Sequence, residues 1–314
     1  MKHHLLLGFA VALTGLGCRA AADPPLADRP IRAVATTGMI ADLVDNIGGE
    51  RLELTGLMGP GVDPHLYTAT AADMGRLARA DIIFYNGLHL EGKMSTIFED
   101  MRRRGIRTVA VTDALSATEL RPAADGMHGP HDPHVWFDVR LWMKAARHVC
   151  EALKELDPTH AASYQARTDR YLAQLADLHA EVRRKAEQVP RGQRVLITAH
   201  DAFYYFGQAY GFEVRGLQGI STAEEPSVEA VQSLAAFIAE RRLPAIFVES
   251  SVPPRTIQAV QRAVAARGHT VAIGGELFSD ALGDAGTPEG TYIGMIRHNI
   301  DTIVKALAPA QGEP

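Results

Sequence analysis

The chain is predicted to adopt an α/β fold of two lobes, each built on a mostly parallel sheet with flanking helices, connected by one long helix. Two observations predict it. In both halves of the 314-residue sequence, short β-rich runs alternate with amphipathic helical stretches, which is the pattern of βαβ units. Between the halves, residues 159–189 contain neither glycine nor proline, which favours a single uninterrupted helix.

The first half contains four β-rich runs with helical stretches between them. We expect strands at residues 31–36, 52–58, 81–87 and 107–112, and helices at residues 39–49, 72–80 and 94–104. The run DIIFYNG at 81–87 has the continuous apolar centre of a buried strand. The first helix is closed by Gly48 and Gly49, and glycine is frequent at helix ends.

The second half repeats this order. We expect strands at residues 194–200, 212–217, 245–250 and 270–275, and helices at residues 202–210, 227–242, 256–268 and about 292–307. Ser227 precedes the amphipathic run VEAVQSLAAFIAERR and is a predicted N-cap. Gly268 closes the helix that follows the third strand.

The segment between the halves is predicted to be stiff. Asp157 is a predicted cap and Pro158 occupies the first helical position. The apolar face is marked by Leu172, Leu175, Leu178 and Val182. Such a helix spans roughly 45–50 Å and would hold the two sheets at a nearly fixed distance, unlike a flexible Gly/Ser hinge. The predicted domains are an N-terminal lobe (31–155), a linking helix (156–190) and a C-terminal lobe (191–314).

The first 22 residues are interpreted as an export signal and excluded from the fold. A short basic start precedes the apolar run LLLGFAVALTGLG, which is too short to span a bilayer as a mature helix. Cys18 suggests a lipoprotein signal, although Gly15 stands where such signals usually carry leucine; cleavage after Ala22 is the alternative. Either way we expect the protein in the periplasm or on the outer face of the cytoplasmic membrane, with a lipid anchor in the first case.

Composition narrows the classes of partner. The formal net charge is −5 and there is no basic block, which argues against nucleic acid. Hydrophobic residues make up 46% of the chain, enough for a real core. Cys150 lies in an apolar helical stretch, and Cys18 is either lipidated or removed, so we expect an inert buried thiol and no disulfide.

The heptad HGPHDPH at 128–134 raises the question of a metal site. Its two prolines exclude a helix and favour extended geometry. In polyproline geometry, His128 and His134 would lie roughly 19 Å apart, whereas zinc needs nitrogens at about 2.0–2.1 Å. The heptad alone is therefore either a weakly metal-binding loop, with His131 and His128 exposed to solvent, or one corner of a site completed elsewhere.

Metal-capable side chains follow strands in both halves. In open parallel sheets, ligands bind beyond the carboxyl ends of the strands. The first half offers His65 and His134 there, and the second offers His200 together with an acidic group. The acidic candidates are Glu276, Asp280 and Asp284. Three imidazoles and one carboxylate from separate loops would complete a tetrahedral zinc shell.

Other polar residues near these positions have less specific interpretations. Glu249 ends a strand facing the same cleft and could orient an imidazole. Asp63 and Asp138 are either outer partners of ligands or turn residues. The isolated histidines are interpreted as structural: His89, His148, His160, His179, His269 and His298.

Five motifs resemble one family. GVDPHLY, DPHVWFD, TAHDAFYYF, GLQGISTAEEPS and GGELFSDALG, in this order, are similar to the cluster A-I solute-binding proteins of zinc/manganese ABC importers, especially the TroA-type receptors. The resemblance covers roughly residues 31–308. It implies two α/β lobes, each with a four-stranded parallel sheet, one long backbone helix between them, and one metal ion held by His65, His134, His200 and Asp280.

The resemblance also bears on the metal. Members dedicated to manganese typically carry glutamate where this chain has His200, and histidine there is shared with zinc-binding members and TroA-type receptors. Three imidazoles and one carboxylate suit Zn²⁺ better than Mn²⁺, which favours more oxygen donors. We therefore expect Zn²⁺ as the cargo, with Mn²⁺ or Fe²⁺ as alternatives.

Three functions compete. The first is an extracytoplasmic, monomeric metal receptor that delivers its ion to the permease of an ABC importer. The second is a secreted zinc hydrolase, which would need an open coordination position and a general base; the sequence has no HExxH or GxSxG motif. The third is a surface adhesin or structural lipoprotein, in which removing metal ligands would leave function intact. We expect the first, and no enzymatic activity.

Overall fold

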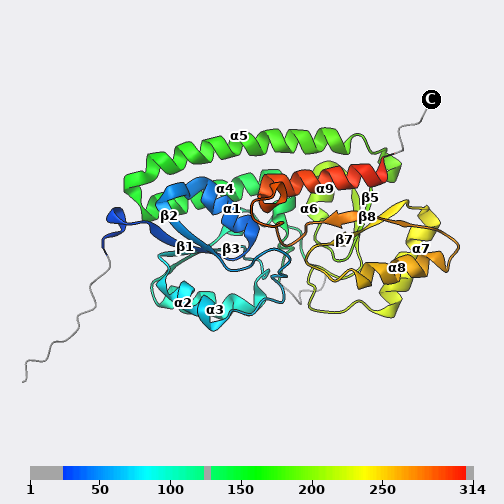
Figure 1. The fold of residues 1–314 in the computed structure, drawn as a ribbon, viewed down its shortest axis with the longest axis horizontal. Helices are drawn as coiled ribbons and strands as arrows, with labels where there is room; N and C mark the ends of the chain where they lie inside the picture. The colour runs from blue at the N-terminus through cyan, green and yellow to red at the C-terminus, as the bar shows by residue number, and fades with distance from the viewer. Residues whose placement is uncertain (1–23, 124–128, 309–314) are drawn as a thin grey trace, which may run out of the picture.

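The computed structural model describes residues 24–123 and 129–308. Two α/β lobes lie side by side, and one long helix runs along both of them (Figure 1). The predicted export signal with Cys18, and His128 of the heptad, lie outside the described residues. No helix among those residues is long and apolar enough to cross a membrane.

The first lobe contains a four-stranded parallel sheet in the order β2-β1-β3-β4. Its strands are β1 (Ile31–Ala35), β2 (Leu52–Gly56), β3 (Ile82–Tyr85) and β4 (Arg107–Ala110). Helices α1 (Gly38–Gly48) and α4 (Val139–Leu156) lie on the side of the long helix, and α2 (Ala71–Arg79) and α3 (Ser95–Arg103) lie on the opposite side (Figure 1). All four predicted strands are present, each ending within two residues of its predicted end.

The second lobe contains β5 (Val195–Thr198), β6 (Glu213–Gly216), β7 (Ala245–Glu249) and β8 (Ala272–Leu277). Parallel ladders join β5 to β6 and β7 to β8, and β5 lies next to β7. The four predicted strands are therefore hydrogen-bonded as two parallel pairs. The helices are α6 (Tyr204–Tyr210), α7 (Val228–Arg241), α8 (Arg255–Ala265) and α9 (Tyr292–Leu307). The Ser227 hydroxyl accepts from the amide of Ala230, which confirms the predicted cap of α7.

The long helix α5 comprises Ala161–Ala186, 26 residues, or roughly 39 Å at 1.5 Å per residue. It is shorter than predicted because Pro158–His160 forms a 3₁₀ turn before it. Tyr164, Leu175 and Val182 are buried along its length. Helix α9 packs beside α5, begins near α1 of the first lobe and runs along the second lobe (Figure 1).

Short 3₁₀ turns complete the described elements: Leu26–Asp28 (η1), Gly49–Arg51 (η2), Gly92–Met94 (η3), Val111–Ala114 (η4), Val135–Phe137 (η5), Pro158–His160 (η6), Arg191–Gln193 (η7) and Pro288–Gly290 (η8). Turn η5 follows directly after His134, so the heptad leads into a compact turn and not into an extended tail.

One hydrophobic core passes from the first lobe into the second. It contains Phe84 and Trp142 of the first lobe, Leu175 of α5, and Phe203 and Ile300 of the second lobe. The C-terminal helix reinforces this connection. At its first residue, the Tyr292 amide donates to the Asp42 carboxylate on α1 (3.2 Å). The predicted domain boundaries at 155 and 190 stay a prediction, but a shared core favours lobes that move little relative to each other.

Candidate metal centre

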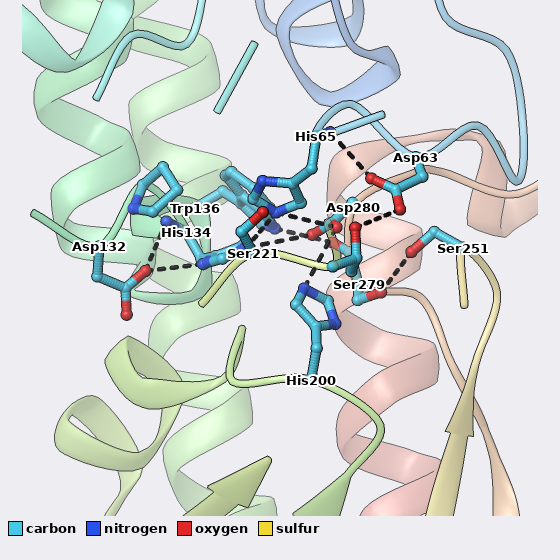
Figure 2. Close-up of polar contacts among 12 residues, drawn as sticks. Asp63, His65, Asp132, His134, Trp136, His200, Ser221, Ser251, Ser279 and Asp280 are labelled. Atoms are coloured by element: carbon cyan, nitrogen blue, oxygen red, sulfur yellow. Dashed lines mark hydrogen bonds and ion pairs between the residues drawn. The ribbon is translucent and has the colours of Figure 1, made fainter. Parts of the chain in front are cut away.

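Four buried side chains converge where the lobes meet. His65 lies in the loop after β2, His134 after β4, His200 after β5 and Asp280 after β8. Each offers a ligand atom, and these atoms all lie within 4.8 Å of one another. Each residue is at most 8% exposed. Figure 2 shows the three imidazoles directed at the Asp280 carboxylate.

The distances leave no room for a protein side chain between the four groups. The Nε2 atoms of His65 and His134 are 3.3 Å apart. Asp280 Oδ1 lies 3.5 Å from His134 Nε2, and Asp280 Oδ2 lies 3.3 Å from His200 Nε2 and 3.7 Å from His65 Nε2. Every ring therefore presents its Nε2 to the same point.

The hydrogen bonding of these groups fits a cation. His200 Nε2 and both carboxylate oxygens of Asp280 are among the described buried atoms without a hydrogen-bond partner. A buried carboxylate without donors is costly unless a positive charge compensates it. A divalent ion at the convergence point would bind all of these atoms at once, and the set of three nitrogens and one carboxylate is chemically suited to zinc.

The pKa shifts of Asp280 and His200 also show strong electrostatic coupling within the cluster. Burial alone would raise the pKa of the Asp280 carboxyl, but the neighbouring His200, His134 and His65 hold that pKa well below its ordinary range. Burial alone would lower the pKa of His200, but Glu249 and Asp280 outweigh it and raise that pKa well above its usual value.

Carboxylates behind two of the imidazoles fix their orientation. Glu249 accepts from the His200 amide (2.8 Å) with one oxygen and lies 2.6 Å from His200 Nδ1 with the other. Asp132 Oδ1 accepts from the His134 amide (3.0 Å) and lies 2.7 Å from His134 Nδ1. A carboxylate on Nδ1 leaves Nε2 free for a metal and raises its basicity. The orienting role expected of Glu249 is therefore present in the geometry.

Asp63 and Asp138 differ from each other. Asp63 accepts from the His65 amide (2.9 Å) with Oδ1 and from the Thr222 hydroxyl (2.5 Å) of the other lobe with Oδ2. Asp138 caps α4 by accepting from the Arg140 amide and pairs with the Arg140 guanidinium. Asp63 is thus a partner of the centre, and Asp138 is a helix cap.

Two residues that support the ligands, Asp132 and Trp136, were not predicted from the sequence. Asp132 lies inside the heptad, and the only available signal was that Asp132-Pro133-His134 repeats Asp63-Pro64-His65. Trp136 donates its indole N–H to the carbonyl of Ser279, the residue before Asp280 (3.1 Å). No local pattern could have indicated that contact, because the two residues belong to different lobes.

The structure does not bring the remaining candidates into the cluster. Glu276 lies within β8 and is exposed, and Asp284 is exposed in the following loop. His131 forms an isolated bridge with Pro122. Among the isolated histidines, His179 lies 3.2 Å from the Tyr210 hydroxyl, and His269 lies 2.9 Å from the Leu243 carbonyl. Cys150 is buried and free, as expected.

Two lobes that enclose one convergent set of metal-capable groups define a two-lobed solute-binding protein. Residues 33–306 match the family model described as zinc-uptake complex component A, periplasmic. The chain belongs to this family, which confirms the expectation that it is a solute-binding protein of a metal ABC importer.

Relatives agree with this assignment. The zinc-binding protein TroA of Treponema pallidum is 54% identical over 296 residues, covering 94% of this chain and 95% of that protein. The manganese-binding lipoprotein MntA of Bacillus subtilis is 45% identical over the same length and coverage. The solved structure of the periplasmic zinc-binding protein TroA from Treponema pallidum superposes with a TM-score of 0.86 at 56% identity, covering 90% of this chain and all of that one. The names of these relatives describe binding of zinc or of manganese.

Proposed function

We propose that this protein captures a Zn²⁺ ion between its lobes, with His65, His134 and His200 as Nε2 ligands and Asp280 as the carboxylate ligand, and delivers it as cargo to the permease of an ABC importer. One observation carries the proposal. Three buried imidazole nitrogens and one buried carboxylate lie within 4.8 Å of one another, and neither oxygen of the carboxylate has a hydrogen-bond partner in the part of the chain that the structure describes.

The donor set favours zinc over manganese. Imidazole nitrogen binds zinc well, manganese prefers oxygen donors, and affinity at a fixed site rises from Mn²⁺ through Fe²⁺ to Zn²⁺. Relatives carry both zinc-binding and manganese-binding in their names. Zn²⁺ is therefore the expected cargo in vitro, while metal availability decides between Zn²⁺, Mn²⁺ and Fe²⁺ in the cell.

The geometry supports a receptor better than a hydrolase. Four protein donors close a tetrahedral shell, whereas catalytic zinc keeps a position for water. Two carboxylates beside the ligands, Glu249 and Asp132, are already engaged with imidazole Nδ1 atoms. Neither is available as a general base, so we expect no ester or phosphate hydrolysis by the zinc-loaded protein.

Capture and release follow from the same contacts. The ligands bind metal in their deprotonated forms, so protons compete with the ion and acid weakens binding. Because α5 runs along both lobes and α9 packs beside it, release is expected to come from small tilts of the lobes or movement of one ligand loop. We expect the receptor to act as a monomer.

The test is competitive zinc titration with elemental analysis of purified mature protein. Wild type should bind one zinc ion per chain, and His200→Ala should lose at least about a hundredfold in affinity because the shell becomes incomplete. His269→Ala, which removes a histidine of the same lobe outside the centre, should bind as wild type does. Tight stoichiometric zinc binding by His200→Ala would overturn the proposed site.

A further inference from the structure

Trp136 contacts both halves of the metal centre. Its ring lies against the imidazole of His134, with ring centroids 5.2 Å apart. Its indole N–H donates to the carbonyl oxygen of Ser279 in the other lobe, at 3.1 Å. The side chain is 1% exposed. One residue therefore joins a ligand of the first lobe to the backbone that carries the ligand of the second (Figure 2).

The backbone before Asp280 is held from two sides. Trp136 holds the Ser279 carbonyl from the first lobe, and the Ser279 hydroxyl lies 2.8 Å from the Ser251 hydroxyl within its own lobe. All of these groups are buried. The Asp280 carboxylate has no hydrogen bond among the described residues and faces only the three imidazoles, so the way its backbone is held contributes to its position.

Trp136 is in turn fixed by the C-terminal helix. The Tyr292 hydroxyl donates to the Trp136 carbonyl (2.7 Å), and the Tyr292 ring stacks on Trp142 at 5.2 Å. Tyr292 is the first residue of α9 and is fully buried. The contacts form a continuous chain from α9 through Trp136 to Ser279, so the indole N–H has a defined direction.

We propose that Trp136 is a positioning residue that fixes the Asp280 carboxylate relative to His134 and thereby determines how long zinc is retained and how strongly it is preferred over manganese. The inference rests on the proposed function. Zinc in a closed four-ligand shell requires its donors at about 2.0–2.2 Å in tetrahedral directions. Manganese has less need of this nitrogen-rich geometry and prefers oxygen donors. A less firmly held Asp280 should therefore lower the affinity for zinc more than the affinity for manganese.

The experiment compares Trp136→Phe with Trp142→Phe. Trp136→Phe keeps an aromatic ring beside His134 but removes the donor to Ser279. Trp142→Phe makes the same change in a buried tryptophan of the same core that stacks on Tyr292, so it controls for lost volume. Zinc and manganese affinities, the zinc dissociation rate and the thermal stability of the metal-free protein are measured for both variants.

We expect Trp136→Phe to weaken zinc binding about tenfold, at the lower end of the effect of removing partners that orient metal ligands. Zinc should dissociate correspondingly faster, and manganese affinity should change less, so the ratio of zinc to manganese affinity should fall. Tyr292→Phe, which releases the Trp136 carbonyl, should shift the same ratio in the same direction by a smaller factor. Trp142→Phe, which keeps an aromatic ring to stack on Tyr292, should shift the ratio less than Trp136→Phe does.

Two results would overturn the inference. One is a ratio of zinc to manganese affinity in Trp136→Phe equal to that of wild type. The other is an equal fall of the ratio in Trp142→Phe, which would make the effect one of core packing. Neither affects the proposed function, which is tested separately by the loss of zinc from His200→Ala; only if that variant retained tight zinc would the site itself be wrong.

Discussion

Two loops of the first lobe carry the same tripeptide, Asp-Pro-His, at residues 63–65 and 132–134. In both, the aspartate Oδ1 accepts the amide of the histidine two residues later, at 2.9 Å and 3.0 Å. Beyond this shared turn the loops differ. Asp132 also contacts the ring Nδ1 of His134, whereas the second oxygen of Asp63 accepts a hydroxyl from the other lobe.

The local sequence is sufficient to form the Asp-Pro-His turn in both loops. The tertiary environment determines what the second oxygen of each aspartate contacts. Asp132 is fully buried and lies 3.3 Å from the Arg121 guanidinium; Arg121 also pairs with Asp201 of the second lobe (2.8 Å). Asp63 is half-buried and faces Thr222. The same residue therefore orients a ligand in one loop and connects the lobes in the other.

Among the changes that test this comparison, the largest effect on zinc affinity is expected from removing the Asp132 carboxylate, which orients His134. Asp132→Ala removes the acceptor from both the His134 amide and ring, and leaves Arg121 with one carboxylate fewer. Zinc affinity should fall about 10–100-fold, as for other carboxylates behind ligating imidazoles. Competitive titration measures this, and an affinity within twofold of wild type would show that His134 is oriented without Asp132.

A smaller effect, on the rate of zinc dissociation, is expected in the loop that contains Asp63. Thr222→Val keeps the shape of the side chain but removes the hydroxyl that donates to Asp63. Loss of one such bond costs about 1 kcal/mol, so zinc should dissociate about fivefold faster. Stopped-flow chelation measures the rate. Thr118→Val, an exposed threonine of the first lobe, is the control, and equal rates for both variants would argue against a connection between the lobes at Asp63.

Asp42 is a third carboxylate at the joint of the lobes, and no cationic side chain pairs with it among residues 24–123 and 129–308. Its effect on stability can therefore be tested by varying the pH. Burial raises the pKa of Asp42 to about 6. Because its folded pKa lies above the unfolded value of 3.8, ionised Asp42 costs stability, and the cost grows as pH rises from about 4 through 6. Asp42→Asn should therefore gain about 1 kcal/mol in unfolding free energy at pH 7.5 relative to pH 4.5.

Urea unfolding of the metal-free protein at both pH values measures this gain. The exposed Asp284→Asn should show no such difference between the two pH values, since it carries no burial cost. If Asp42→Asn were instead more destabilising at pH 7.5 than at pH 4.5, the carboxylate would be stabilising when charged, and burial would not be the dominant influence on it.

The smallest change is expected in overall shape. Since α5 runs along both lobes, α9 packs beside it and one core is shared between the lobes, removing zinc should leave the radius of gyration unchanged within experimental error. Small-angle X-ray scattering of zinc-loaded and chelator-treated protein measures it. A clear expansion without metal would indicate that the lobes open about a hinge and that the bound ion helps to hold them together.

Much of the fold was predictable because its signals are periodic and local. The predicted bounds of α9, residues 292–307, agree with the structure, and Ser227 caps α7 as predicted. Errors came where the end of an element depends on packing. Strand β8 extends to Leu277, so Glu276 points out of a strand instead of following it, and α5 begins only at Ala161.

For the centre, sequence alone located the three histidines by their places after strands but left three acidic candidates, which only the resemblance to a family reduced to Asp280. It did not find Asp132 or Trp136. The reason is physical. Asp132 and Asp63 occupy the same local motif and differ only in what surrounds their remaining carboxylate contacts. Trp136 acts through its indole N–H, which donates to a residue 143 positions away in the sequence.

The sequence by itself determined that this protein has two α/β lobes, a long connecting helix and histidines at the carboxyl ends of strands in both lobes, because alternation of apolar residues and the chemistry of turns act over a few residues. Only the tertiary structure decided which groups orient the rings of those histidines and that one core unites the lobes. Those outcomes depend on distances between residues far apart in the chain, and packing alone sets such distances.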